Sequence, residues 1–428
     1  MHAPEPRPTR ALLEITVING DTWQRLRGAR VDVAGRRVRT DAHGIAYTHV
    51  RHRAAYVVTA SEPGYTTHSV RLPFQISRKQ TIHIYAPAQQ WTMYGVSPSR
   101  GDAQSAIHLR PPFKIDWSQG VGSMVEFPAV VADGVAYVGN LHGVVTALSM
   151  SNGDYVWMHD THGEMAASPA IVGDELVAHG MDGHVWVLDR ATGRLLRYAT
   201  IGSPIESSPV VRDGIDYFGT WSGTLYALDL RTMRARWTKQ LGAKTTSSVA
   251  LDGGTLFVGD YGGRLWALSA RTGRTRWVRG VNGRIYGTPA VAGGRVFVPS
   301  SDGGSLTAFS TSGRYLWRVL TGSYVYSSPA AWGGRVFFGS YGGYLYCVSA
   351  ASGRVVWTVP VGGSISGAAV VVDGVAYAGS FAERIVGADA RTGRVLLRFP
   401  HGYYVPVSGN GGKLLLHGYS RLYAVVPR

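Results

Sequence analysis

The stretch GDYGGRLWALSARTGRTRW, residues Gly259–Trp277, sets the pattern on which most of the chain is built. Forty residues later the chain reads SSDGGSLTAFSTSGRYLW (Ser300–Trp317), and forty after that GSYGGYLYCVSAASGRVVW (Gly339–Trp357). Two markers keep this period from residue 117 onward, and such a fixed period is typical of a repeat architecture. The first is a closing aromatic residue, at Trp117, Trp157, Tyr198, Trp237, Trp277, Trp317, Trp357 and Phe399. The second is a Ser-Pro-Ala-Val type motif, at Pro128, Pro169, Pro209, Ser248, Pro289, Pro329, Ala369 and Pro406.

One repeat contains four short apolar runs separated by turn residues. In the repeat that begins near residue 247 the runs are 247–251, 255–258, 265–269 and 275–277. Runs of this length with Gly and Asp between them predict β-strands rather than helices. A four-stranded unit of about forty residues is typical of a propeller blade. The closing aromatic then lies on the outermost strand, where we expect it to wedge between neighbouring blades.

The two ends of the repeat region complement each other. The last repeat stops after a third strand at 420–425, whereas residues 114–117 form an outer strand with no blade before them. Pairing these two segments closes the ring and leaves no sheet edge at the join. Eight motifs therefore predict an all-β protein with an eight-bladed β-propeller at 114–428, closed by 114–117. Seven blades is the alternative count.

The sequence Leu-Trp-Ala-Leu-(Ser/Asp)-Ala-x-Thr-Gly-x-x-x-Trp at 265–277, repeated at 225–237 and 345–357, resembles the pyrroloquinoline-quinone (PQQ)-type propeller repeat. The resemblance covers residues 114–428. That repeat family includes quinoprotein alcohol dehydrogenases and the propeller lipoprotein of the bacterial outer-membrane barrel-assembly machinery. The resemblance therefore implies the fold, but it does not by itself imply a cofactor.

A different pattern precedes the repeats. Residues 1–10 are rich in Pro and Arg, and we expect them to be disordered. Residues 11–86 alternate as six strands of a small Ig-like sandwich. Their segments 28–33, 40–44 and 63–65 resemble the carboxypeptidase-regulatory (transthyretin-like) module, which implies a spacer or adhesive unit. Residues 87–113 form a linker with many large apolar groups, and we expect it to pack on the propeller.

Composition limits the possible environments. The chain carries 43 basic and 27 acidic residues, a formal charge of +16, and a single cysteine, Cys347, which excludes an internal disulfide. No apolar run approaches the length of a membrane span. The first residues contain no hydrophobic signal region, so the chain is either cytosolic or followed a leader that was removed before Met1. The resemblance implies the second case, with an extracytoplasmic location: periplasmic, cell-surface or secreted.

Loops between second and third strands, and loops between successive blades, meet at one mouth of a propeller channel. This mouth is predicted to be aromatic and acidic, as expected for a site that binds a partner protein or a glycan. The predicted ligand-binding residues are Glu126, Glu164, Glu206, Trp221, Asp260, Tyr261, Tyr286, Tyr326, Tyr341, Phe381 and Tyr404. The alternative interpretation is that the rings pack blade against blade and the carboxylates bind loop amides.

The opposite face is predicted to carry arginine-rich hairpins, at 190–194, 231–236, 271–276 and 391–394. Such a face suits an anionic polymer. Nucleic-acid binding is disfavoured, because the aromatic residues lie at the other mouth instead of among the arginines.

The residues argue against a metal or redox cofactor. The candidate ligands for a transition metal are His142, His179 and His417, but no pair has the spacing of one strand face, so zinc is not predicted. Glu164, Glu206 and Asp260 offer oxygen ligands, but no Asn or Asp constellation at a fixed spacing accompanies them, so calcium is not predicted either. The quinoprotein dehydrogenases of this resemblance carry adjacent cysteines and long insertions. This chain has one cysteine and repeats close to forty residues, so bound quinone is not predicted.

These observations favour an exported, non-enzymatic binding or scaffold protein of the cell envelope or surface, whose propeller mouth or rim binds a partner. Two alternatives stay open. One is a quinone- or metal-dependent oxidoreductase acting on sugars or alcohols, and the other is a surface adhesin or lectin.

Overall fold

The computed structural model describes residues 10–51, 55–72 and 79–428. Residues 1–10 were predicted to be disordered, and residues 1–9 of this segment lie outside the described residues. The chain divides into two compact units, Met1–Gln90 and Trp91–Arg428. In the described residues no helix is both long enough and apolar enough to cross a lipid bilayer.

The first unit consists of two small sheets that share one core. Its strands are β1 (Arg10–Asn19), β2 (Arg30–Val33), β3 (Arg36–Arg39), β4 (Ile45–Arg51), β5 (Tyr56–Ser61), β6 (His68–Leu72) and β7 (Lys79–Ile84), followed by the 3₁₀ turn η1 (Pro87–Gln89). The sheet orders are β4-β1-β7 and β3-β2-β5-β6. Ile15, Val31, Val58 and Ile82 are among the buried residues of the common core. Strand β3 was not among the six predicted strands, because its sequence RRVR lacks an apolar alternation.

The second unit contains eight sheets, all within residues 91–428, which the structure describes without a gap. The first four sheets are β10–β13 (Val130–Ala132, Val135–Gly139, Val144–Ser149, Tyr155–Asp160), β14–β17 (Ala170–Val172, Glu175–His179, His184–Asp189, Leu195–Thr200), β18–β21 (Val210–Arg212, Ile215–Gly219, Thr224–Asp229, Arg234–Gln240) and β22–β25 (Ala250–Asp252, Thr255–Gly259, Arg264–Ser269, Thr275–Gly280). The fifth and sixth are β26–β29 (Ala290–Ala292, Arg295–Ser300, Ser305–Ser310, Tyr315–Leu320) and β30–β33 (Ala330–Trp332, Arg335–Gly339, Tyr344–Ser349, Val355–Pro360). The seventh joins β34–β37 (Val370–Val372, Val375–Ser380, Arg384–Asp389, Val395–Pro400) to β8 (Ala103–Gln104), and the eighth joins β38–β40 (Val407–Gly409, Leu414–His417, Arg421–Pro427) to β9 (Phe113–Gly120).

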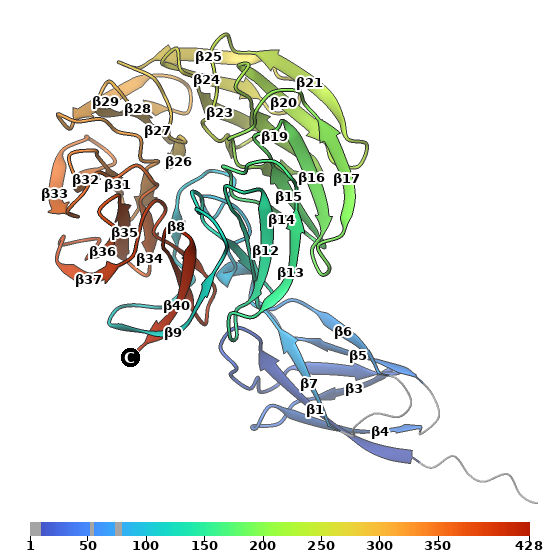
Figure 1. Ribbon diagram of the computed structural model, residues 1–428. Coiled ribbons are helices and arrows are strands. Elements are labelled where there is room, and N and C mark those ends of the chain that lie inside the picture. The colour runs from blue at the N-terminus through green and yellow to red at the C-terminus, as the bar shows by residue number, and fades with distance from the viewer. Residues whose placement is uncertain (1–9, 52–54, 73–78) are drawn as a thin grey trace, which may run out of the picture. The chain divides into compact units, whose positions relative to one another are not determined.

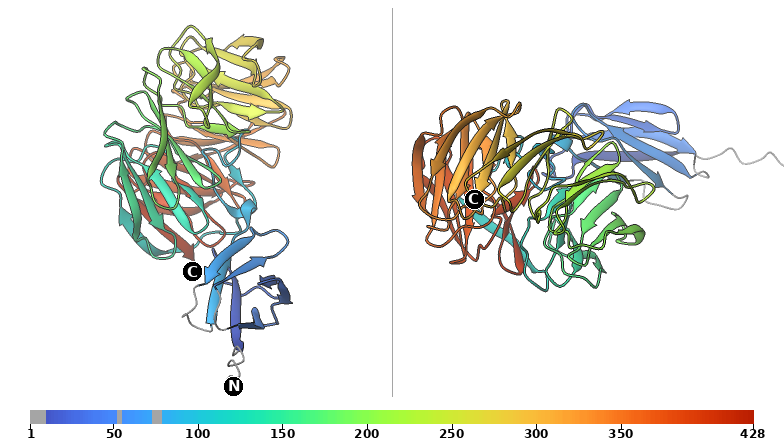
Figure 2. Two further views of the ribbon diagram at one scale, coloured as in Figure 1. Left: turned by 90° about the vertical axis from the view of Figure 1, so that its right-hand side faces the viewer. Right: turned by 90° about the horizontal axis from the view of Figure 1, so that it is seen from above.

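The sheets follow one another around a centre, in the order of the sequence, as in a β-propeller (Figure 1). The views in Figure 2 show the same succession from two other sides. The last sheet takes its outer strand from the start of the unit. β40 pairs antiparallel with β9, and Ala424 and Val425 lie opposite Trp117 and Ile115. This is the pairing that the sequence analysis expected between 114–117 and the end of the chain.

A β-bulge recurs between the third and fourth strands of every sheet in this unit, for example at Ala267/Leu268. It places the closing residue of one sheet over the third hairpin of the next. Trp237 donates its indole N–H to the carbonyl oxygen of Ala270 at 3.0 Å, and Trp157 does the same to Arg190. The indole also covers the hairpin glycine, since a Cβ on Gly273 would lie 2.7 Å from Cε3 of Trp237. Adjacent sheets are thereby joined by one side chain.

Two of the predicted closing aromatics do not take this position. In the second sheet Arg197, not Tyr198, lies opposite Val187, which is equivalent to the Ala147–Trp157 pair of the first sheet. Tyr198 is 56% exposed, and Arg197 Nε donates to the carbonyl of Leu230 at 2.9 Å in place of an indole. In the seventh sheet Leu397, not Phe399, holds the position. The prediction that Tyr198 and Phe399 keep the wedge is therefore wrong.

Residues 91–104, here called the channel segment, run along the innermost strands. Backbone amides at the same place in six sheets donate to its carbonyls: Val131, Ile171, Leu251, Val291, Ala331 and Val371 to Trp91, Thr92, Pro98, Ser99, Gly101 and Asp102, respectively. Strand β8 then pairs in parallel with β34. The linker was expected to pack on the propeller; residues 91–104 occupy its centre.

Arg100 ties the channel segment to the third and fourth sheets. Its guanidinium donates to the carbonyls of Val249 (2.9 Å), Ser208 (3.0 Å) and Pro209 (2.8 Å), and to that of Tyr94. Burial lowers the pKa of Arg100 to about 10, so the side chain stays protonated at neutral pH. Val96, Arg100 and Asp102 have positive φ angles of 67°, 57° and 47°. Surrounding contacts hold such strained backbone in place.

Candidate functional site

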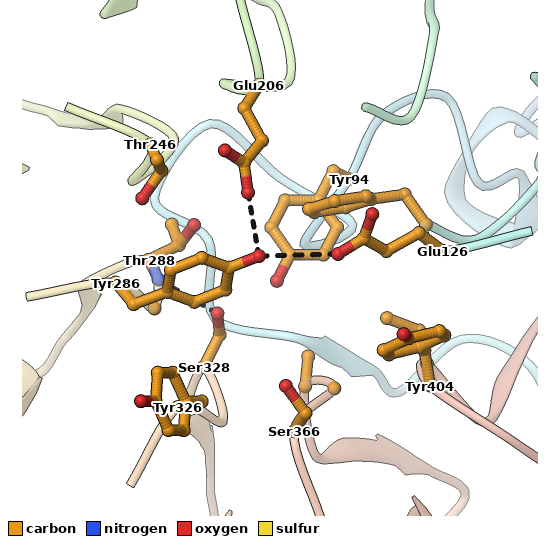
Figure 3. A pocket seen from close by; sticks show the side chains of 15 residues that line it. Tyr94, Glu126, Glu206, Thr246, Tyr286, Thr288, Tyr326, Ser328, Ser366 and Tyr404 are labelled. Atoms are coloured by element: carbon orange, nitrogen blue, oxygen red, sulfur yellow. Dashed lines mark hydrogen bonds between the residues drawn. The ribbon is translucent and has the colours of Figure 1, made fainter. Parts of the chain in front are cut away.

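One pocket lies at the centre of the ring, and residues from equivalent positions in the repeats line it (Figure 3). These positions directly precede the innermost strands and are forty residues apart, except at the last. The lining residues of this set are Glu126, Glu206, Thr246, Tyr286, Tyr326, Ser366 and Tyr404. The equivalent residue of the second sheet by this spacing is Ala166. The repeat therefore delivers one side chain from each sheet except the second to a common centre.

A chain of hydroxyl groups holds these loops in register. The amide of Ser168 donates to Oγ of Ser208 (3.1 Å), that of Ser208 to Oγ of Ser248 (2.9 Å), and that of Ser248 to Oγ1 of Thr288 (3.1 Å). The amide of Thr288 continues the chain to Oγ of Ser328 (2.8 Å). All five residues are buried. The Ser of the Ser-Pro motif thus has a structural role, which fixes the positions from which the pocket residues project.

Two carboxylates share the hydroxyl group of Tyr286. The hydroxyl donates to Oε1 of Glu206 at 2.7 Å, and its oxygen lies 3.3 Å from Oε1 of Glu126. Figure 3 shows both carboxylates directed at this oxygen from different sheets. A phenol has one proton to donate, so the second carboxylate receives little stabilisation. Burial, together with repulsion by Glu206, raises the pKa of Glu126 to about 7.

Glu206 is also held from the rim of the mouth. Trp221 donates its indole N–H to Oε2 of Glu206 at 3.0 Å. The ammonium group of Lys244 lies 3.2 Å from the centre of the Trp221 ring and 5.2 Å from that of Tyr261. Burial lowers the pKa of Lys244, and the charge of Glu206 opposes this shift. This cation lies over an aromatic face instead of forming an ion pair.

Aromatic rings continue around the mouth from this point. The centroids of Tyr286 and Tyr326 are 5.4 Å apart, those of Tyr326 and Tyr341 4.8 Å, and those of Tyr341 and Phe381 5.9 Å. Phe381 packs edge-on against Tyr404 at 5.2 Å. Desolvation raises the pKa of Tyr404 to about 12, so its hydroxyl stays protonated. These aromatic rings thus form a wall around the mouth that begins at the two carboxylates, with Tyr286, and runs as far as Tyr404.

Tyr94 of the channel segment lies at the base of the pocket, beneath the carboxylates (Figure 3). Burial raises the pKa of Tyr94 far above its usual value, so it too is neutral. The volume of the pocket is about 30 Å³, on a scale where one buried water takes about 10–15 Å³. It therefore has room for about two or three waters or for the tip of a single side chain.

Two predicted residues lie outside this arrangement. Glu164 is exposed and two positions out of phase with Glu126 and Glu206; its carbonyl accepts a hydrogen bond from Met181, so it belongs to the outer loop. Asp260 is fully buried, and its carboxylate accepts hydrogen bonds from Arg264 and Trp266 at 2.8–3.1 Å. Its role is to hold a turn. Of the other predicted residues, five line the pocket, and Trp221, Tyr261, Tyr341 and Phe381 form the surrounding rim.

The three candidate histidines are far from a common site. His179 is buried between the carbonyl of Ser207 (2.6 Å) and the carboxylate of Asp216 (2.8 Å). His417 is buried, and burial lowers its pKa to about 4; its Nε2 accepts the amide of Ala129 at 3.1 Å. His142 is exposed. Among the described residues there is no group of three His, Cys, Asp or Glu side chains placed to hold a metal ion.

The sequence analysis did not include Tyr94, Lys244, Thr246 or Tyr403 in the site. The forty-residue step from Glu206 leads to Thr246, so the period of the sequence was sufficient to identify Thr246 as a residue of the site. The ring centroid of Tyr403 lies 5.2 Å from that of Phe381 and 4.7 Å from that of Tyr404. The prediction took only Tyr404 from this pair of neighbours in the sequence, so Tyr403 was missed. Tyr94 precedes the repeats, and no periodic signal leads to it.

The face with the hairpins has a second hollow, of about 370 Å³, lined by Ser105, Arg110, Trp332, Asp373, Gly374, Asp389 and Arg391. Its charges are matched locally. Arg110 forms an ion pair with Asp389 at 2.8 Å, and elsewhere on hairpins Arg190 pairs with Asp133 at 2.8 Å. These aspartates reduce the positive charge that the arginines were expected to present.

The sequence of this chain is similar to those of known proteins. The family model described as outer membrane protein assembly factor BamB matches residues 78–249 and 221–425. Among curated proteins, outer membrane protein assembly factor BamB of Bordetella pertussis is 28% identical over 101 residues, which are 23% of this chain. That alignment spans only 25% of the relative.

Solved structures share the fold at low sequence identity. BamB from Moraxella catarrhalis has a TM-score of 0.63 and 18% identity, covering 74% of this chain and 98% of that one. A quinohemoprotein alcohol dehydrogenase from Comamonas testosteroni has a TM-score of 0.68 and 15% identity, covering 79% and 80%. The computationally designed Ika8 protein reaches 0.64 at 17% identity, covering 73% and 99%. The structural likeness shows a shared propeller fold, and the family model, which matches most of the sequence, shows that this chain belongs to the family described as outer membrane protein assembly factor BamB.

Proposed function

We propose that this protein is a non-enzymatic scaffold of the bacterial cell envelope, whose propeller has eight blades and binds a partner protein at its aromatic mouth. Family membership supports the envelope role, since the relatives are named as outer membrane protein assembly factors. The single observation that carries the binding role is the pair Glu126–Glu206, which forms no direct ion pair with any described Lys, Arg or His and is enclosed by aromatic rings at the centre of the ring. Such a polar centre with apolar walls is typical of a recognition site.

For the first unit we propose the spacer role of a carboxypeptidase-regulatory-like sandwich. Its two sheets around one apolar core support this proposal. Among the described residues of this unit we identify no enclosed cluster of carboxylates and aromatic rings like that at the mouth of the propeller.

A quinone-dependent oxidoreductase is the second candidate, because a quinohemoprotein alcohol dehydrogenase shares the fold. The residues at the centre do not fit a quinone cofactor. Tyr94 occupies the base of the pocket, and about 30 Å³ is too small for a tricyclic ring system. Nor does Cys347 approach this place, since it is buried between the sixth and seventh sheets. A lectin function has no comparable support, because none of the relatives and solved structures reported above is named as a carbohydrate-binding protein.

Site-specific crosslinking tests the proposal. A photoreactive residue at Tyr341, on the rim, should capture one discrete protein from the native envelope fraction. The same residue at Tyr315, exposed on outer strand β29, should not. Equal capture at both positions would contradict the assignment of the mouth. Oxidation of an alcohol or sugar by protein supplied with quinone and calcium, measured with a dye acceptor, would instead favour the oxidoreductase.

A further inference from the structure

In the described part of the chain, the two carboxylates at the centre of the mouth form no direct ion pair, and the charge nearest to them, that of Lys244, lies over the Trp221 ring. Among the described residues no Lys, Arg or His nitrogen lies within 4 Å of the carboxylate of Glu126 or of Glu206, although many other carboxylates of the chain are paired in this way. Glu206 is 7% exposed. Removing ionised groups from water without a partner is unfavourable. The site is therefore incomplete as an electrostatic unit.

The geometry suits a donor that bonds in several directions. Oε1 of Glu126 and Oε1 of Glu206 both lie within hydrogen-bond distance of the Tyr286 oxygen, at 3.3 and 2.7 Å, so they are no more than about 6 Å apart. A guanidinium has five N–H donors in a fixed plane and bonds two carboxylates at once. It also stacks on aromatic faces, and it is more weakly hydrated than an ammonium group.

The walls and the size of the pocket narrow the choice further. The rings of Tyr286, Tyr326 and Tyr404 line it, and Tyr94 closes its base. These surfaces attract a cation through their π-faces. The volume of about 30 Å³ admits one side-chain tip and excludes a whole small-molecule ligand. Lys244 does not fill this role, since it lies against Trp221 on the far side of Glu206.

We infer that the pocket binds a cationic side chain, an arginine carried on a loop of the partner protein, with Glu126 and Glu206 as its counter-charges and Tyr286, Tyr326 and Tyr404 as its walls. This inference rests on the proposed partner-binding function. It adds the chemistry of the contact: the partner presents a protruding basic residue, and the surrounding rings of the rim receive the rest of its loop.

A pair of probes tests the contact directly in the full-length protein. The capped peptide Gly-Arg-Gly should bind with an affinity on the order of millimolar, as expected for one side chain, measured by ligand-observed NMR. The same peptide with citrulline, which is nearly the same shape but uncharged, should bind at least about tenfold more weakly. The double variant Glu126→Gln/Glu206→Gln should lose the preference for arginine. Glu164→Gln removes one carboxylate from the exposed outer loop and should keep it.

The affinity should also depend on pH. Glu126 is faced by Glu206, Tyr286 and Tyr404, with Lys244 beyond Glu206, and with its pKa near 7 it is mostly protonated at pH 6 and ionised at pH 8. Arginine keeps its charge throughout, so affinity should rise about tenfold from pH 6 to pH 8. Glu126→Gln should flatten this dependence. If Glu126 had only a structural role, the affinity for the arginine peptide would not rise with pH in this way.

Three outcomes would overturn the inference: equal binding of the arginine and citrulline peptides, unchanged preference in the double variant, or stronger competition by calcium than by the arginine peptide. The crosslinking at Tyr341 separates this failure from that of the proposed function. If the partner is still captured by the folded double variant, the protein binds its partner without the arginine contact. If capture at Tyr341 fails in the unmodified protein as well, the mouth is not the binding surface.

Discussion

At the scale of single residues, the carboxylate of Glu126 is the group whose state depends most on its surroundings in the mouth. Burial and the charge of Glu206 raise its pKa from 4.5 to about 7. The folded protein therefore binds a proton between these pH values that the unfolded chain releases. By linkage, this group lowers stability progressively as pH rises from about 4.5 to 7, and the full cost is present above pH 7.

Glu126→Gln should accordingly stabilise the unliganded protein at pH 8, by at most about 3 kcal/mol for a shift of this size. At pH 5 the two proteins should differ little, because Glu126 is then protonated in the folded state. Urea unfolding at both pH values measures the difference. A gain that is equal at pH 5 and pH 8, or a similar gain in Glu164→Gln, would contradict this origin.

Arg100 is the residue on which the centre of the propeller depends most. Its guanidinium satisfies four carbonyl groups from two parts of the ring and from Tyr94. Arg100→Met leaves these buried acceptors without donors, and each such loss costs about 1–3 kcal/mol. Arg100→Lys should not restore stability, because an ammonium presents its three donors at a single point. We expect both variants to lower the thermal midpoint markedly. A lysine variant that unfolds like the unmodified protein would refute this account.

At the scale of elements, the hairpin between the third and fourth strands and the Trp of the preceding sheet form one unit. Six Trp–Gly pairs have this form, from Trp117 with Gly153 to Trp357 with Gly393. Two sheets lack the Trp, with Arg197 and Leu397 in its place, and the first of them is consistent with this unit. Where Arg197 replaces the Trp, the hairpin position holds Met233 instead of Gly. A side chain is tolerated there because no indole covers this hairpin.

Two glycines of the fourth sheet allow the effect of the Trp contact on stability to be measured separately from that of backbone strain. Gly273 and Gly253 both have positive φ, 68° and 50°, but only Gly273 faces Trp237; nothing lies within 4 Å of a Cβ at Gly253. Gly253→Ala should cost about 1 kcal/mol of stability. Gly273→Ala should cost roughly 2 kcal/mol more, since a methyl group there displaces the indole. Thermal unfolding of the two variants gives the comparison, and equal midpoints would show that the Trp contact contributes little.

At the scale of the whole molecule, the channel segment links the sheets from inside, as the pairing of β9 with β40 links them at the ends. A chain that begins at Trp91 should keep the thermal midpoint of the second unit. A chain that begins at Phe113 should lose it or aggregate, because the amides of six inner strands lose their acceptors. Circular dichroism with heating distinguishes the two. If the shorter chain unfolds at the same temperature, the segment is dispensable for the fold.

Much of the architecture follows from the period alone. The forty-residue step places Glu206 and Tyr286 at equivalent positions two sheets apart, in loops between successive blades, and these loops were predicted to meet at the mouth. Glu164 was assigned to the mouth because it is an acidic residue of a loop between blades, although the forty-residue step from Glu126 leads to Ala166. Tyr198 and Phe399 were assigned to the wedge because they are aromatic, whereas the forty-residue step from Trp157 and Trp357 leads to Arg197 and Leu397, which hold the position in the structure.

The amino-acid sequence by itself determined the repeat, its strands and the closure of the ring, because strand propensity, turn residues and a fixed spacing are local properties that recur. Only the tertiary structure decided that residues 91–104 fill the centre, that Tyr94 forms the base of the pocket, and that Glu126 and Glu206 share one hydroxyl group. These are contacts between groups far apart in the chain, such as the 160 residues between Glu126 and Tyr286. Their distances and burial arise from packing, and no local pattern encodes them.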